Sequence, residues 1–317
     1  MQHPILGLHH VTATVDDAQQ DLDFCTGLLG LRLIKKTVNF DNHSVYHFYY
    51  GDEVGTPGTI WTTFPYRGWR VPVGQKGRGQ VTVTSFSAPV ESLEYWRARL
   101  EAHSIAVGER TTPFGAPVLG FDDPSGLHFD IVGCNNDLRA PWAGQGVEAQ
   151  HAIRGIHGVT MQVENPAPSV ALLTDLLGFR VTGEGEGLLR VAVNGDVPGH
   201  RVDIAHSGLD SDAKNGIGTV HHVALAIDTA EQQLRLREEL VHRGVSVTPV
   251  LDRQYFQSIY FREPGGVLFE VATMHPGFTV DEPLAELGRG LKLPGWEEPN
   301  RATIETGLAP IVHRGVP

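Results

Sequence analysis

The chain has 317 residues, of which 41% are hydrophobic, and a formal net charge of −12. This length suffices for about two domains. The negative charge, with no cluster of lysine or arginine, argues against nucleic acid as a partner. No apolar run approaches the roughly 18 residues that a membrane-spanning helix needs. The opening residues MQHPILGLHHVT lack the charged and apolar regions of a signal peptide, and the two cysteines lie far apart. We therefore expect a cytoplasmic protein that does not bind membranes.

Four similar modules follow one another along the chain. Residues 8–33 match residues 156–181 without a gap, and residues 122–132 match residues 262–272. Self-similarity of this kind indicates duplicated structural units. In chain order, the modules span about residues 7–66, 78–135, 154–207 and 217–275.

The fourth module has the clearest secondary-structure signals. It begins with the β-prone run VHHVALAI, and Thr229 and Gln232 then have the spacing of a helix capping box. Leu236 and Leu240 lie four residues apart on one face of the predicted helix, which we expect to end near Gly244. Three further β-prone runs follow, so the predicted order is βαβββ.

Four βαβββ modules predict an α+β fold with two tandem domains of two modules each. The predicted N-terminal domain covers residues 1–136 and the C-terminal domain covers residues 154–275. Residues 137–153 are polar with glycine and proline, as in interdomain linkers. Residues 276–317 have weak periodicity and are predicted to form an arm that wraps the domains.

Two histidine pairs and one glutamate point to a metal site. His9-His10 and His221-His222 each open a predicted strand, and Glu270 lies in another. Two imidazoles and one carboxylate form the facial ligand set of non-heme Fe(II) sites, which leave positions open for substrate and O₂. Because adjacent residues of a strand point to opposite faces, one histidine of each pair would reach the metal. The pattern alone does not say which one.

The repeats provide an internal comparison for this hypothesis. In the matching frames, Gly158, Thr82 and Asp130 stand where His10, His222 and Glu270 stand. A single histidine in a strand is usually a packed core residue. One set of positions holds three potential ligands, whereas the other set holds neither histidine. This contrast favours one intact site and one decayed site.

The sequence resembles the vicinal-oxygen-chelate superfamily, whose unit is the βαβββ module. Within it, the chain is similar to the extradiol-type ring-cleaving dioxygenases that act on hydroquinones. The resemblance covers nearly the whole chain. Its most distinctive segments are YHFYYGDEVGTPGT (46–59), DRQYFQSIYFREPGGVLFE (252–270) and GFTVDE (277–282). It implies two tandem glyoxalase/extradiol-dioxygenase-like domains.

The resemblance also implies specific roles for residues. The Fe(II) ligands fall on His10, His222 and Glu270. The surrounding functional residues fall on His9, Thr12, His221, Arg253 and Tyr260. We expect His221 to carry protons near neutral pH, since an ordinary histidine has a pKa of about 6.5. Arg253 is expected to stabilise an oxygen-derived anion, and Tyr260 to donate a hydrogen bond.

Several alternatives stay open at this point. Mn(II) has similar ligand preferences to Fe(II), and the substrate can be a catechol rather than a hydroquinone. A glyoxalase-type metal-dependent isomerase or lyase, or a non-catalytic module that binds aromatic compounds, would have the same fold. Arg253 can instead pair with the neighbouring Asp252, Tyr260 can be a core residue, and His47 and His128 are predicted to be structural. The expected partners are a small aromatic substrate and O₂, and a homo-oligomer is left open.

Overall fold

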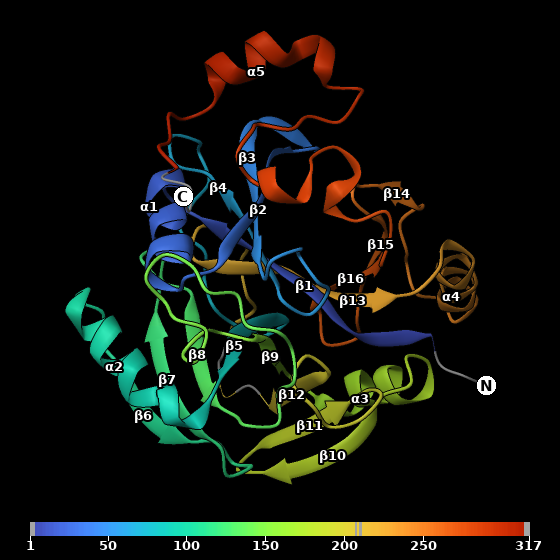
Figure 1. Ribbon diagram of the computed structural model, residues 1–317. Helices are drawn as coiled ribbons and strands as arrows, with labels where there is room; N and C mark the ends of the chain where they lie inside the picture. Colours follow the sequence, from blue (N-terminus) through green and yellow to red (C-terminus); the bar gives the residue numbers. More distant parts are fainter. Residues whose placement is uncertain (1–3, 207, 209–210, 314–317) are drawn as a thin grey trace.

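The computed structural model describes residues 4–206, 208 and 211–313, which form two eight-stranded sheets (Figure 1). The first two modules contribute β1 (Ile5–Val15), β2 (Arg32–Asn39), β3 (Asn42–Gly51), β4 (Ile60–Pro65), β5 (Gln80–Ala88), β6 (Gly108–Thr111), β7 (Pro117–Asp122) and β8 (His128–Gly133). The last two contribute β9 (Gly155–Val163), β10 (Arg180–Gly185), β11 (Leu188–Ala192), β12 (Arg201–His206), β13 (Thr219–Ile227), β14 (Leu251–Asp252), β15 (Gln257–Arg262) and β16 (Leu268–Thr273). The predicted α+β fold of four βαβββ modules is confirmed.

One helix follows the first strand of each module, and a fifth helix lies in the C-terminal arm. The α-helices are α1 (Ala18–Leu22), α2 (Leu93–Ala102), α3 (Pro166–Asp175), α4 (Ala230–His242) and α5 (Arg301–Gly307). The first helix continues as a π-helical segment, Asp23–Leu28. Short 3-10 helices span Val90–Ser92, Phe278–Val280, Leu284–Glu286 and Glu298–Asn300. Within the described part of the chain, no helix is both long and apolar enough to cross a bilayer.

The sheets combine the modules in a nested order. The first sheet runs β14-β15-β16-β13-β1-β4-β3-β2 and joins the first module to the fourth. The second sheet runs β10-β11-β12-β9-β5-β8-β7-β6 and joins the second module to the third. The sheets therefore do not coincide with the sequence-based domains 1–136 and 154–275. Residues 137–153 connect two modules of the same sheet, whereas the chain passes between the sheets after β4 and after β12.

The physical reason lies in the free edge of each module. The first strand of a module pairs with its own last strand on one side, as β1 does with β4. Its other edge needs a partner, because unpaired backbone groups of a strand are costly to bury. In the first sheet β1 pairs antiparallel with β13, and in the second β5 pairs antiparallel with β9. The repeat pattern specifies that such partners exist, but it does not specify which modules they belong to.

Strand alternation divides the first sheet into a core face and an open face. On β4, Trp61 is 1% exposed and its ring lies 5.0 Å from the ring of Phe129 in the second sheet. The neighbouring Thr62 therefore points to the opposite face. This open face of the first sheet carries the candidate site.

The helix of the fourth module forms as the sequence predicts. Thr229 and Gln232 make both hydrogen bonds of a capping box. Leu236 and Leu240 are buried against the sheet. The helix stops before Gly244, whose φ of +80° favours glycine.

The C-terminal arm packs onto the first sheet, drawn in red over the blue strands in Figure 1. The ammonium group of Lys35, on β2, is fully buried and lies 2.6 Å from Asp281 and 2.8 Å from Glu282 of the arm. Gly288 has a φ of +78°, and a Cβ there would lie 2.0 Å from the carbonyl oxygen of Leu33. A buried ion pair and a close backbone approach thus attach the arm beside β2.

Candidate active site

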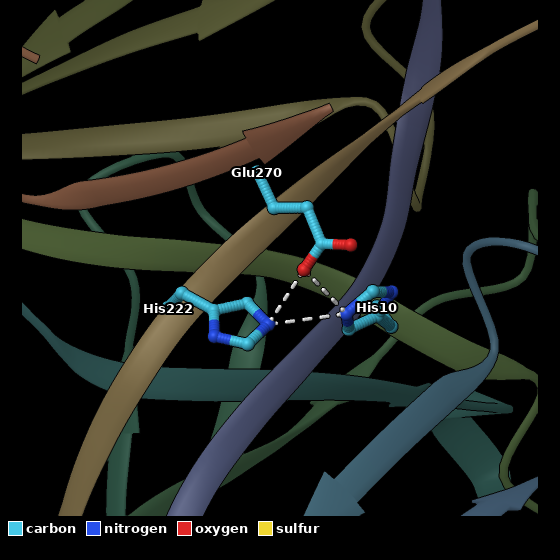
Figure 2. Close-up of side chains that lie close together, drawn as sticks. All are labelled: His10, His222 and Glu270. Atoms are coloured by element: carbon cyan, nitrogen blue, oxygen red, sulfur yellow. Dashed lines mark hydrogen bonds and ion pairs between the residues drawn. The ribbon is translucent and has the colours of Figure 1, made fainter. Parts of the chain in front are cut away.

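Three neighbouring strands bring His10, His222 and Glu270 together (Figure 2). His10 on β1 pairs with Ala224 on β13, and Ala224 pairs with Glu270 on β16. His222 lies two residues before Ala224, so its side chain is on the same face. His10 Nε2 lies 3.2 Å from His222 Nε2 and 3.2 Å from Glu270 Oε2, and His222 Nε2 lies 2.8 Å from Glu270 Oε2.

These three groups have the donor atoms and burial of a metal site. All three residues are at most 5% exposed, and their donor atoms lie within 4.8 Å of one another. Within the described part of the chain, Oε2 of Glu270 has no hydrogen-bond partner, whereas Oε1 accepts a hydrogen bond from Ser258. Burial would raise the pKa of Glu270, but His10 and His222 lower it well below its ordinary value. A buried, ionised carboxylate beside two imidazole nitrogens fits a divalent cation.

The first histidine of each pair contacts the second through Nδ1. His9 Nδ1 lies 2.8 Å from His10 Nδ1, and His221 Nδ1 lies 2.8 Å from His222 Nδ1. If Nε2 of His10 and His222 binds a metal, Nδ1 must carry the proton and donate it in this hydrogen bond. The neighbouring histidine then accepts at Nδ1 and carries its own proton on Nε2. Each pair thereby fixes the tautomer and the ring orientation of one potential ligand.

His221 does not have the acid–base behaviour expected from its residue type. Burial, followed by His222, lowers the pKa of His221 to about 3, so the ring stays neutral near pH 7. His9 is similar, because burial and then His10 lower its pKa to about 3. This lowered pKa argues against the expected switch of charge near neutrality. If Nε2 of His222 binds a metal, Nδ1 of His221 accepts from His222, and a neutral His221 then presents only an N–H donor, at Nε2, to its surroundings.

A cavity of about 500 Å³ opens in front of the triad. His221, Arg253 and Tyr260 line it together with aromatic residues such as Tyr49 and Phe64. Its position over the open face of the first sheet leaves room for a small aromatic molecule beside the three donor groups.

Arg253 is held at the edge of this cavity by two partners. Its Nε donates to the hydroxyl of Tyr260 over 3.2 Å, and Nη2 donates to Asp41 over 3.3 Å. The neighbouring Asp252 instead accepts from the backbone N–H of Gln254. The acidic partner of Arg253 therefore comes from the β2–β3 turn, 212 residues away in sequence.

Tyr260 is a protonated phenol that faces the cavity. Burial, followed by Glu270, raises the pKa of its hydroxyl well above the ordinary value. Because the hydroxyl accepts from Arg253, its own proton remains available for donation. Tyr260 also pairs across the sheet with Glu270, which explains how a residue in an apolar strand reaches the site.

Thr12 and His47 belong to one hydrogen-bonded chain beside the triad. Thr12 Oγ1 lies 2.8 Å from Thr62 Oγ1, which lies 2.9 Å from His47 Nε2. His47 lines the cavity, although the sequence predicts a structural role for it. Its alternation with Tyr49 in the strand HFYY was the signal that could have placed it on the same face. His128, by contrast, lies in the second sheet and pairs with Asp122 at 2.7 Å.

The matching positions of the second sheet have a different environment. Asp130 pairs with Arg110, and Gly158 lies against the side chain of Arg201. Among the described residues, the triad in the first sheet is the one group of three histidine, cysteine or acidic side chains close enough to share an ion. This arrangement agrees with the hypothesis of one intact and one decayed site.

Comparisons with known proteins identify relatives of this chain and the family to which they belong. A family model described as the glyoxalase/bleomycin resistance protein/dioxygenase superfamily matches residues 155–271. The chain is 41% identical to "Putative ring-cleaving dioxygenase MhqO" of Bacillus subtilis over 310 residues, which cover 98% of both chains. It is 34% identical to chlorohydroquinone/hydroquinone 1,2-dioxygenase of Sphingobium indicum, covering 98% of this chain and 99% of that protein.

Solved structures extend the comparison. A crystal structure of a B. subtilis protein, described as a putative dioxygenase, superposes with a TM-score of 0.94 at 40% identity, covering 99% of this chain and 100% of that one. Glyoxalase I from Zea mays shares the fold alone, with a TM-score of 0.63 at 12% identity over 84% of this chain and 92% of its own. The four-module fold, the His/His/Glu group and the full-length similarity together lead to one conclusion: the chain belongs to the glyoxalase/bleomycin resistance protein/dioxygenase superfamily, in the family of these ring-cleaving dioxygenases.

Proposed function

We propose that this protein is an Fe(II)-dependent dioxygenase that cleaves the ring of a hydroquinone or a catechol-like compound. The observation that carries the proposal is the buried group of His10, His222 and Glu270 at the base of an aromatic-lined cavity. The substrate named for the S. indicum relative supports a hydroquinone.

In this proposal His10, His222 and Glu270 are the metal ligands. Fe(II) bound by two imidazoles and a carboxylate supplies open positions at which substrate and O₂ react. Ser258 orients the carboxylate of Glu270 through Oε1, and His9 and His221 orient the two imidazoles through Nδ1. Mn(II) has similar ligand preferences, so the choice of metal belongs to the test.

The remaining residues act on the substrate through hydrogen bonds and charge. The guanidinium of Arg253 places positive charge at the cavity, where negative charge builds up on oxygen during ring cleavage. Tyr260 can donate its free hydroxyl proton to an oxygen of the substrate or of O₂. His221 can donate from Nε2 but has no free lone pair, so we assign it a donor role rather than that of a base. Thr12 supports the cavity wall through Thr62.

Oxygen uptake tests the proposal directly. The protein is reconstituted anaerobically with Fe(II) or Mn(II), and then mixed with O₂ and a panel of hydroquinones and catechols. We expect one O₂ to be consumed per ring, with a ring-opened product identified by mass spectrometry. His222→Ala should lose bound metal and uptake together. No uptake with any compound and either metal would overturn the proposal, and unchanged ligand binding by His222→Ala would favour a binding protein.

A further inference from the structure

A chain of hydrogen bonds crosses the open face of the first sheet and ends at His47. It runs from Thr12 on β1 through Thr62 on β4 to Nε2 of His47 on β3, with steps of 2.8 and 2.9 Å. Thr12 and Thr62 are direct neighbours in the parallel β1–β4 ladder, so their side chains lie on the same face. Thr12 is two residues from His10, so the chain begins beside the triad.

The other nitrogen of His47 is free to meet a ligand. His47 lines the cavity, and among the described residues no protein atom forms a hydrogen bond with its Nδ1. Its ring is fixed between Tyr49 and Phe64, whose ring centroids lie 4.0 and 4.3 Å away. Nδ1 of His47 is thus a polar atom held between two aromatic rings.

Two other polar side chains that line the cavity have protein partners. Arg253 is bonded to Tyr260 and Asp41. Asn39 donates to the hydroxyl of Tyr66 and accepts from a backbone N–H. No described residue forms a hydrogen bond with Nε2 of His221, but His221 lies on the strand that carries His222. His47 is two strands from His10, which separates their backbones by about 10 Å.

The two threonine hydroxyls allow His47 to present either a lone pair or a proton. If Nε2 carries the proton, it donates to Thr62, Thr62 donates to Thr12, and Nδ1 offers a lone pair to the cavity. If both hydrogen bonds run in the opposite direction, Thr12 donates to Thr62, Thr62 donates to Nε2, and Nδ1 offers an N–H to the cavity. Burial, followed by the nearby His10 and His222, lowers the pKa of His47 well below its ordinary value, so the ring is neutral in either form.

We propose that His47 contacts the substrate and determines its class: Nδ1 binds the ring oxygen that is not on the metal, so the site selects dihydroxylated rings over monophenols. This inference rests on the proposed function, because it assumes that the first ring oxygen binds at the triad. A lone pair on Nδ1 accepts a hydrogen bond from the second hydroxyl and increases the electron density of the ring. No proton or electron leaves the substrate in this contact.

Paired ligands give a test that does not depend on turnover. The Fe(II)-loaded full chain is titrated anaerobically with hydroquinone and with phenol, which lacks the second hydroxyl. Wild type should bind hydroquinone more tightly than phenol. His47→Phe keeps an aromatic ring between Tyr49 and Phe64 but should weaken hydroquinone binding by about tenfold and leave phenol binding nearly unchanged.

Two further variants and a control define the role of the side chain. His47→Gln keeps a hydrogen-bonding group and should retain part of the preference for hydroquinone. Thr62→Val removes the anchor of Nε2 and should lower the preference less than His47→Phe does. His43→Phe makes the same substitution on the outer part of β3, at a side chain that is 44% exposed, and should bind both ligands as wild type does.

The outcomes separate this inference from the proposed function. Suppose that wild type consumes O₂ with hydroquinone, but that His47→Phe weakens the binding of hydroquinone and of phenol equally, or weakens neither. The role of His47 is then refuted, and ring cleavage stands. If wild type consumes no O₂ with any dihydroxylated ring, the proposed function fails and this inference fails with it. Selective loss of hydroquinone binding, with wild-type iron content, supports the inference.

Discussion

Replacement of Glu270 by glutamine isolates the charge of the candidate ligand set. Oε2 of Glu270 lies 2.8 Å from His222 Nε2 and 3.2 Å from His10 Nε2, and it has no hydrogen-bond partner among the residues that the structure describes. Glutamine keeps the shape of the side chain but removes the negative charge that a cation needs. Removing a residue that only orients a ligand typically costs about 10–100-fold in metal affinity. We therefore expect a loss of at least about 100-fold for Glu270→Gln.

This loss has a measurable effect on stability. A 100-fold lower affinity removes about 2.7 kcal/mol of metal-linked stabilisation when wild type is saturated. For a chain of this size the difference corresponds to about 4 °C in melting temperature. Calorimetry with and without Fe(II), under anaerobic conditions, measures the increase in melting temperature that the metal causes. Wild type should show a clear increase, and Glu270→Gln should show little or none.

The repeat provides a matched control for this experiment. Asp130 occupies the equivalent position of the second sheet, where it pairs with Arg110. Asp130→Asn can lower the stability of the metal-free protein, but it should leave the metal-dependent increase at the wild-type value. If Fe(II) raised the melting temperature of Glu270→Gln as much as that of wild type, Glu270 would contribute nothing to metal binding. That result would refute the reasoning.

Two further predictions concern groups outside the cavity. Lys35→Met leaves the buried carboxylate of Glu282 and the partly buried carboxylate of Asp281 without their cation and should lower the free energy of unfolding by about 3–5 kcal/mol in urea titrations. The half-buried Lys36 makes no ion pair within the described chain, so an equal effect of Lys36→Met would contradict this explanation. Burial raises the pKa of Asp21 from 3.8 to about 6, so the folded protein binds more protons than the unfolded chain between these values. Stability should therefore fall as the pH rises through this window, and Asp21→Asn should remove up to about 3 kcal/mol of the pH dependence. Parallel stability curves for wild type and Asp21→Asn would contradict the shift.

Local features of the fold were predictable because their causes are local. The helix of the fourth module depends on a capping box, on apolar residues four positions apart and on a glycine at its end, all of which lie within 16 residues, 229–244. The pairing of modules depends instead on which free strand edge meets which. The pairing of β1 with β13 joins segments more than 200 residues apart, and the first strands of the modules have similar sequences. The nested order of the sheets therefore could not be predicted from the repeats.

The same distinction applies to the candidate site. The two histidine pairs and the glutamate motif predicted a site, but strand alternation left open which histidine of each pair would reach a metal, and the family resemblance implied His10 and His222. The structure places these two histidines beside Glu270. His47 has no such pattern, and its partner Thr62 is 15 residues away on another strand. The contact between Arg253 and Asp41 depends on a turn from the opposite end of the chain. Contacts made across the cavity follow from the curvature of the sheet rather than from any sequence motif.

The environment of the second sheet explains why duplication left one candidate metal site among the described residues rather than two. His157 is the repeat counterpart of His9, but its Nε2 lies 2.7 Å from a guanidinium nitrogen of Arg201 rather than beside a second histidine. Asp130 retains a carboxylate, yet Arg110 already neutralises it. A divalent cation at this position would have to displace one guanidinium and would lie near another. Restoring the missing histidines alone would therefore not restore a metal site, because Arg110 and Arg201 would still place positive charge beside the position.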